Sequence, residues 1–159
     1  MPRWRPRRDA RTYTARTHHV AVVISRGNGR GWPGADCEGG EVIIIEGKFQ
    51  PYYRMTQRSK FADPRAKSYL ASKSELQRQM RSGMTYEMWP KGTPLEVKIT
   101  VLMPSRLHSQ DLDNQVKALL DAAKGILFYD DRYVDAVAAT RELADRYRVL
   151  MTVGELLPF

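Results

Sequence analysis

The chain has little of what several common protein classes require. Cys37 is the single cysteine among 159 residues, which excludes an intramolecular disulfide and a zinc site built on cysteines. No apolar run approaches the roughly 20 residues that a membrane-spanning helix needs. No G-x-x-x-x-G-K-[ST] motif occurs, which excludes a P-loop nucleotide site. Residues 18–25 are too short for a secretory hydrophobic region and lack a nearby cleavage pattern, so we expect a cytoplasmic protein without a membrane partner.

Acidic residues are the minority among the charged ones, and their distribution is informative. The net charge is +8 with a pI near 9.8, which favours nucleic acid as the partner. Within residues 111–135 the sign reverses, because six aspartates face three basic residues for a net charge of −3, and the rest of the chain therefore carries +11. A carboxylate cluster inside a basic surface can hold a divalent cation against a phosphate backbone.

The first 40 residues differ in composition from the rest. They hold eight arginines, no lysine and three acidic residues, for a net charge of +5. Residues 27–40 are rich in Gly and Pro and are typical of a linker, and a short strand over Val20–Ser25 is compatible with the pattern. We expect residues 1–40 to be a basic, poorly ordered extension. It is either an arm that binds the DNA backbone or a dispensable segment.

Residues 41–159 predict a small single domain of the α/β (α+β) class, with a mixed sheet of about four strands and two main helices. Residues 47–61 read as a long basic and aromatic loop before the first helix, which Asp63-Pro64 starts with a capping residue and Pro at the first helical position. The last two strands are expected to form a hairpin about Ala144-Asp145. The predicted strands are Glu41–Glu46, Leu95–Met103, Val134–Leu143 and Arg146–Val153, and the helices run from Asp63 to about Met80 and from Leu112 to about Lys124.

The second helix is predicted to present carboxylates. With its apolar side turned to the core, Asp113 and Lys117 lie on the outer side and Asp111 stands at the N-cap. Asp130 and Asp131 end the loop that leaves this helix, and we expect that loop to fold back to the same place. Three carboxylates within about 5 Å repel by about 3 kcal/mol per pair, whereas a bound Mg²⁺ makes the interaction energy of the cluster favourable. Water on such an ion becomes acidic enough to attack phosphorus, and Lys117 would stabilise the transition-state oxygens.

The same residues have ordinary structural explanations, which the sequence leaves open. An aspartate at an N-cap or in a first helical turn is common. Lys117 can form i,i+4 ion pairs with Asp113 and Asp121, and Asp130-Asp131 can be a plain turn. A calcium loop is excluded, because Gln115 and Val116 stand where an oxygen ligand and the turn glycine belong.

The segment D-L-D-N-Q-V-K-A-L-L-D-A-A-K-G-I-L-F-Y-D-D-R-Y-V resembles the RusA family of Holliday junction resolvases, often carried by phages and prophages. The shared pattern is D-x-D-N, a lysine three residues on, a further Asp, a Gly and an aromatic-rich D-D-x-x-[VI], and the resemblance extends more loosely back to about residue 41. It implies a homodimeric, Mg²⁺-dependent enzyme, with Mn²⁺ as a substitute ion, that nicks two opposed strands of a four-way DNA junction in recombination and repair. By motif match the metal ligands are Asp111, Asp113 and Asp131 with Asp130 as a helper, and the catalytic lysine is Lys117.

One position departs from the family pattern. A basic residue commonly precedes D-x-D-N in the family, whereas here Gln110 does, with Arg106 four residues earlier. From the resemblance, the leading hypothesis is a junction-selective endodeoxyribonuclease, and the alternatives are a nuclease for forks or flaps and a non-catalytic basic DNA-binding protein.

The basic loop supplies most of the expected DNA contacts, and Tyr52 or Tyr53 is a candidate wedge at the crossover of the junction. The residues expected to contact DNA are Lys48, Tyr53, Arg54, Arg58, Lys60 and Arg106.

Overall fold

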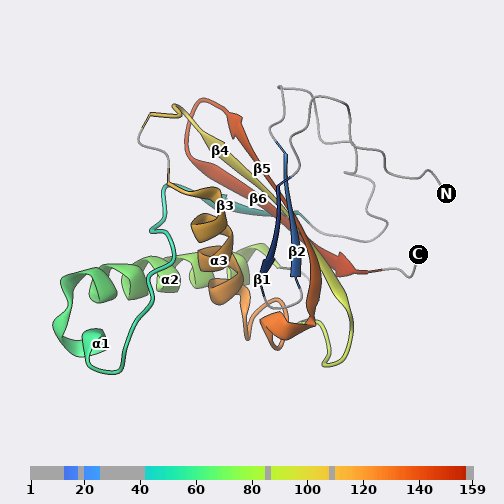
Figure 1. Cartoon of the computed structure of the whole chain (residues 1–159), viewed down its shortest axis with the longest axis horizontal. Coiled ribbons are helices and arrows are strands. Elements are labelled where there is room, and N and C mark those ends of the chain that lie inside the picture. Colours follow the sequence, from blue (N-terminus) through green and yellow to red (C-terminus); the bar gives the residue numbers. More distant parts are fainter. Residues whose placement is uncertain (1–12, 18–19, 26–41, 85–86, 108–109, 157–159) are drawn as a thin grey trace.

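A mixed β-sheet forms the frame of the protein (Figure 1). The structure, a computed structural model, describes residues 13–17, 20–25, 42–84, 87–107 and 110–156, the first two ranges as backbone alone. The strand order is β1-β2-β5-β4-β6-β3, with β2, β5 and β4 parallel to one another and the other pairings antiparallel. The strands are β1 (Tyr13–Thr17), β2 (Val20–Ser25), β3 (Val42–Glu46), β4 (Leu95–Met103), β5 (Val134–Leu143) and β6 (Arg148–Glu155).

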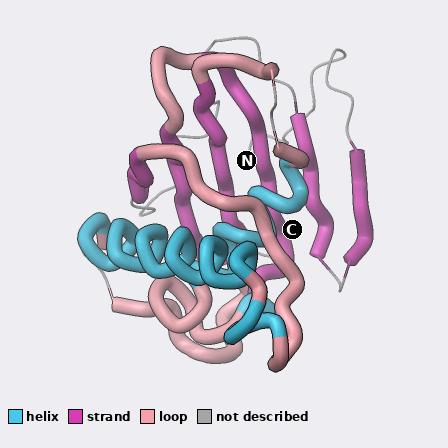
Figure 2. The backbone as a smooth tube through the Cα atoms, turned by 90° about the vertical axis from the view of Figure 1, so that its left-hand side faces the viewer, coloured by secondary structure: helices cyan, strands magenta, loops and turns pink. Residues whose placement is uncertain are grey.

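Two long helices, α2 (Pro64–Gly83) and α3 (Leu112–Ala123), lie side by side on one face of the sheet (Figures 1 and 2). A short helix, α1 (Ser59–Ala62), interrupts the loop that precedes α2. The predicted start of α2 is confirmed, since Asp63 accepts a hydrogen bond from the Arg65 N–H at 2.8 Å and Pro64 occupies the first turn. The mixed α/β character expected from residues 41–159 is confirmed as well.

The core lies between the sheet and these helices. Strand β4 alternates strictly between buried and half-buried side chains, and β6 continues the alternation beside it. On α3 the apolar side expected from the 3.6-residue period is buried, with the half-buried Leu112 and Leu120 at its margin. Fully buried side chains from the two layers include Ile43, Leu95, Ile99, Met151, Met80, Leu119, Leu127 and Phe128.

Helix α3 is the crossover between the parallel strands β4 and β5. Because both strands run in one direction, the helix between them runs back, and Figure 1 shows α3 descending from the outgoing end of β4 to the beginning of β5. Gly125, with φ of 78°, turns the chain out of the helix. The two ends of α3 therefore lie at opposite ends of the sheet.

The predicted hairpin between the last two strands is wrong. Strand β4 pairs with β5 on one side and with β6 on the other, so β5 and β6 are not neighbours. The Ala144 N–H bonds to the Met103 carbonyl at 2.9 Å, which carries the connection over the end of β4. A nine-residue strand with every second side chain buried needs a partner along each edge, and the two later strands supply them.

The N-terminal residues add to the predicted sheet. The possible strand over Val20–Ser25 is present as β2, which pairs in parallel with β5 and carries β1 on its outer edge. The expected linker 27–40 and Cys37 lie outside the described residues, so the division of the chain near residue 40 stays a prediction. Among the helices of the described residues, none combines the length and apolarity that a bilayer crossing demands.

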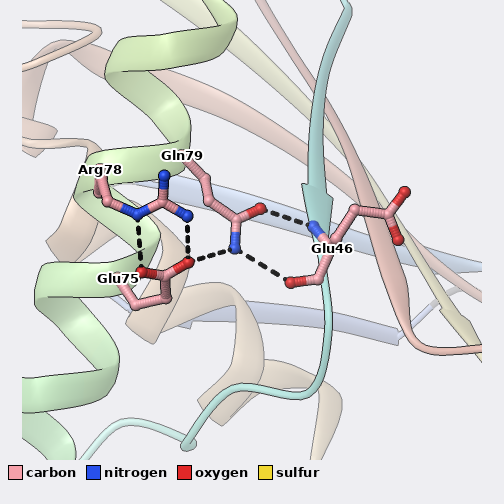
Figure 3. Close-up of polar contacts among 4 residues, drawn as sticks. All are labelled: Glu46, Glu75, Arg78 and Gln79. Atoms are coloured by element: carbon pink, nitrogen blue, oxygen red, sulfur yellow. Dashed lines mark hydrogen bonds and ion pairs between the residues drawn. The ribbon is translucent and has the colours of Figure 1, made fainter.

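The opposite edge of the sheet, strand β3, is closed by a side chain of α2. The Gln79 carboxamide accepts from the Glu46 N–H at 2.7 Å and donates to the Glu46 carbonyl at 3.1 Å (Figure 3). The same amide nitrogen donates to Glu75 at 2.9 Å, and Arg78 pairs with that carboxylate at 2.7 Å. An edge strand with exposed N–H and C=O groups invites unwanted pairing, and here Gln79 occupies that position.

Candidate active site

The first turn of α3 carries two exposed carboxylates. Asp111 is the N-cap residue by its backbone, yet its side chain makes no capping hydrogen bond, unlike Asp63 at the start of α2. Asp113 follows in the first turn, where the helix dipole stabilises a negative charge. The explanation of Asp111 as an ordinary capping side chain therefore does not apply, because its carboxylate does not bond to the N–H groups of its own helix.

Lys117 contacts Asp113 across one turn of α3. The ammonium lies 2.8 Å from Oδ2 of Asp113, the i,i+4 pair that the sequence left open. Both side chains are about half exposed, at 46% and 49%, so the pair contributes little to stability. Asp113 and Lys117 nevertheless sit together, as a carboxylate ligand and a phosphate-binding cation would.

Asp121, the second acidic residue within α3, belongs to the contact between the helices. It accepts a hydrogen bond from the Tyr69 hydroxyl at 2.7 Å and forms an ion pair with Lys73 at 3.1 Å, and both partners belong to α2. Burial, and then the bond to Asp121, raise the pKa of the Tyr69 hydroxyl. Asp121 therefore holds α2 against α3.

Asp130 and Asp131 form a second acidic pair, at the far end of α3. Asp130 accepts from the Arg132 N–H at 3.2 Å and pairs with Lys124, the C-cap residue of α3, at 3.3 Å. A hydrogen bond with Asp131, followed by the Arg132 N–H and Lys124, lowers the pKa of Asp130 to about 2. Partial burial and the neighbouring Asp130 raise the pKa of Asp131. Two adjacent carboxyl groups whose pKa values are displaced in opposite directions mark a candidate functional site.

The two acidic pairs do not meet within one chain. They are separated by the length of α3, about 18 Å for 12 residues at 1.5 Å each. Figure 1 shows the short 3₁₀ turn η1 (Asp131–Tyr133) leading into β5 at the end of the sheet opposite to the start of α3. The expected return of Asp130 and Asp131 to the start of the helix is therefore wrong for a single chain. Among the described residues, no three His, Cys, Asp or Glu side chains gather closely enough to hold a metal ion together, so one chain alone does not assemble the ligand set expected from Asp111, Asp113 and Asp131.

The basic loop passes beside the start of α3. The Tyr52 N–H donates to the Asn114 carbonyl at 3.0 Å, which places the loop against the D-x-D-N segment. Tyr52 is 40% exposed and meets Tyr69 edge to face, with ring centroids 5.9 Å apart. Tyr53, in contrast, donates its hydroxyl to Asp63 at 2.5 Å and packs on the core, and that bond raises the pKa of Tyr53. Tyr52 is therefore the more accessible ring of the two.

The remaining residues expected to contact DNA are spread over several places. Arg54, Arg58 and Lys60 are exposed along the loop and α1, and Arg106 is exposed in the segment that leads to α3. Lys48 lies 5.5 Å from the ring centroid of Tyr147, at the start of the loop. The structure thus brings Arg54 and Arg106 to the two segments that flank the start of α3, whereas Lys48 lies beside the chain that enters β6.

Sequence reasoning missed a polar group beneath the start of α3. Gln115 is only 5% exposed, and Arg141 of β5 donates from Nη2 both to Oε1 of Gln115, at 3.2 Å, and to the Gln110 carbonyl. A glutamine near the apolar stripe of an amphipathic helix was the available signal, because a buried amide needs a polar partner. Which residue would be that partner depended on the strand order.

Comparison with known proteins bears on residues 45–153. The sequence model of the family described as "Endodeoxyribonuclease RusA" matches this range, which is more than half of the chain and includes both acidic pairs, α3 and the whole basic loop. No curated protein matches the chain.

Proposed function

Because the chain belongs to the RusA family of endodeoxyribonucleases, we propose that it is a divalent-cation-dependent nuclease that resolves four-way DNA junctions. The observation that carries this proposal is the arrangement about α3. A carboxylate pair with Lys117 stands at its start, a second pair of adjacent carboxyl groups stands at its end, and the basic loop contacts Asn114. Resolution would serve DNA recombination and repair.

We propose further that two copies of the chain complete each site. A two-fold axis beside α3 would bring the start of one helix next to the end of the partner's, so Asp111 and Asp113 of one protomer would face the partner's Asp130 and Asp131. The charges at the two ends of α3 suit this, since Asp113 in the first turn and Lys124 at the C-cap have opposite sign. The protein would then be a homodimer with two sites, matching the near two-fold symmetry of a four-way junction.

The donor set of such a paired site is carboxylate oxygen, which Mg²⁺ and Mn²⁺ accept. A bound ion would supply an acidified water and screen the charge that develops on the phosphate. The protein's own contributions are binding and orientation. Lys117 would hold the scissile phosphate, and the positive loop would draw in the DNA backbone irrespective of sequence.

A panel of labelled substrates tests the activity. We expect the wild-type protein to cut a synthetic four-way junction in Mg²⁺, to be inactive in EDTA, and to leave linear duplex intact. Preferential cutting of forks or flaps would support a nuclease for other branched DNA. Binding without cutting, with no effect of any divalent ion, would support the non-catalytic alternative, which the structural partners of Asp113, Asp121 and Asp130 favour.

Mixing two inactive variants tests whether the site spans two chains. A hybrid dimer of Asp113→Asn and Asp131→Asn has one composite site with both defects and one with neither, so the mixture should regain nicking activity. If each site were built from a single chain, both sites of the hybrid would be defective and the mixture would stay inactive. The two variants are unfolded and refolded together so that hybrid dimers form. Each variant alone, treated in the same way, is the matched control.

A further inference from the structure

Arg141 connects β5 to the start of α3. It lies half-buried near the outgoing end of β5, and its Nη2 donates to the Gln110 carbonyl and, at 3.2 Å, to Oε1 of Gln115. Of the two acceptors, the Gln115 side chain is nearly inaccessible to solvent. The side chain is therefore engaged inside the fold, unlike the exposed arginines of the basic loop.

A β-bulge directs Arg141 toward the helix. The pairing of β4 with β5 shifts between Leu95 and Glu96, which pair with Val134 and Ala136 and leave Asp135 as the extra residue. Val134 faces the core, so plain alternation would turn residues 136, 138 and 140 inward and Arg141 to the other face. The extra residue moves the inward positions to 137, 139 and 141, and Val137 and Ala139 are accordingly buried.

The two acceptors of Arg141 bracket the D-x-D-N segment. The Gln110 carbonyl belongs to the peptide group that leads into Asp111, and Gln115 follows directly after Asn114. The Gln115 N–H also donates to the Asp111 carbonyl at 3.1 Å, the first hydrogen bond of the helix. Since Asp111 makes no capping bond to its own helix, the backbone that carries it is held by Arg141 from one side and by this bond from the other.

Arg141, which belongs to β5, also brings a positive charge next to Gln110. The residue directly before D-x-D-N is Gln110, and the guanidinium of Arg141 binds the carbonyl of that same residue.

We infer that Arg141 is a positioning residue for Asp111, and through it for Asp113, in strand cleavage. The inference rests on the proposed function. Removal of the guanidinium frees the peptide before Asp111 and leaves the buried Gln115 amide without its charged donor. The carboxylates then lose their fixed geometry, while the DNA-binding loop keeps its residues.

The experiment compares Arg141→Gln and Arg141→Lys with Arg148→Gln. Arg148 is a matched control, a half-buried arginine on β6 that pairs with Glu46. Under single-turnover conditions with saturating enzyme, we expect Arg141→Gln to cut the junction about 10- to 100-fold more slowly, a loss typical of groups that orient metal ligands. Its dissociation constant for the junction in EDTA should stay within about threefold of wild type, which separates the chemical step from binding. Arg141→Lys should recover part of the rate, and Arg148→Gln should cut normally.

Amide hydrogen exchange supplies a readout independent of cleavage. In Arg141→Gln the Gln115 amide, which bonds to the Asp111 carbonyl, should exchange faster, while the Lys124 amide, which bonds to the Leu120 carbonyl, should not change. Equal acceleration at both ends of α3 would indicate general destabilisation and overturn the inference.

The cleavage outcomes separate the two proposals. If wild type cuts, Asp113→Asn does not, and Arg141→Gln cuts at the wild-type rate, the positioning role alone is overturned. A drop in junction affinity that accounts for the whole loss of rate in Arg141→Gln would overturn it as well. If wild type cuts no branched DNA in Mg²⁺, the proposed function fails and the positioning role fails with it.

Discussion

Gln79 pairs with the backbone of Glu46 as a neighbouring strand would. Its carboxamide accepts from the N–H and donates to the C=O of this one residue, at 2.7 and 3.1 Å, at the edge of the sheet. The same amide contacts Glu75, which Arg78 holds in turn (Figure 3). One side chain of α2 thus closes the end of β3 and orients an ion pair on the helix surface.

Replacing Gln79 by Ala removes both bonds to Glu46. At about 0.5–1.5 kcal/mol for each bond, we expect the free energy of unfolding to fall by roughly 1–3 kcal/mol. Urea denaturation monitored by circular dichroism measures this loss. The matched control is Gln57→Ala, an exposed glutamine in the basic loop, for which we expect a change of at most about 0.5 kcal/mol. Equal stability of the two variants would contradict the role of Gln79.

Glu75 gives the stability of the protein a predictable dependence on pH. Hydrogen bonds from Arg78 and then Gln79 lower the pKa of Glu75 to about 2 in the folded protein, against about 4.5 without them. A carboxyl whose pKa is lower in the folded state stabilises the fold above the unfolded value, and this contribution disappears as the pH falls toward 2. Glu75→Gln should therefore be less stable than wild type at pH 7, with the difference shrinking between pH 4.5 and 2.

Arg78→Gln is the test of the cause. It removes the first contributor to the low pKa of Glu75, so its stability difference from wild type should shrink over the same acidic window. Thermal denaturation of the three proteins at several pH values supplies the comparison. A difference that stays constant from pH 7 to pH 2 in either variant would show that Glu75 titrates without coupling to folding.

Asp113 and Asp121 lie on the same helix and should differ in function. Asp113→Asn should lose junction cleavage by roughly 100-fold or more, because it removes a proposed carboxylate ligand rather than a group that only orients one. Binding of the junction should be unchanged or tighter, since a negative charge is removed. Asp121→Asn should cut normally but be less stable, because Asp121 accepts from Tyr69 and Lys73. Normal cutting by Asp113→Asn would exclude the proposed site.

Binding of the junction should depend steeply on salt, with a contribution from the basic loop. Each phosphate contact adds about −0.9 to the slope of log K against log salt, so Arg54→Ala or Arg58→Ala should make the slope less negative by about 1. Fluorescence anisotropy in EDTA at several salt concentrations measures the slope. Arg146→Ala is the control, because Arg146 is exposed but paired with Glu46 at 3.5 Å. A slope that neither Arg54→Ala nor Arg58→Ala changes would place the DNA elsewhere.

Local patterns were sufficient for the elements that carry the candidate site. The start of α2 at Asp63-Pro64, the extent of α3 and the alternation of β4 were all predictable, because capping, amphipathic periodicity and alternation act over a few neighbouring residues. The hairpin between β5 and β6 was not, since adjacency in sequence does not specify which strand edges pair. From the sequence, Tyr53 and Tyr52 are equal candidates for a contact with DNA, but in the folded chain the Tyr53 hydroxyl bonds to Asp63.

The amino-acid sequence alone settled the charge distribution, the D-x-D-N segment with Lys117 one turn on, the second acidic pair and the membership of a nuclease family, all of which depend on residue types and short spacings. The folded chain decided that α3 separates the two acidic pairs, and that a bulge at Asp135 turns Arg141 toward Gln110. Those relationships come from strand order and pairing register, which depend on contacts between residues far apart in the chain.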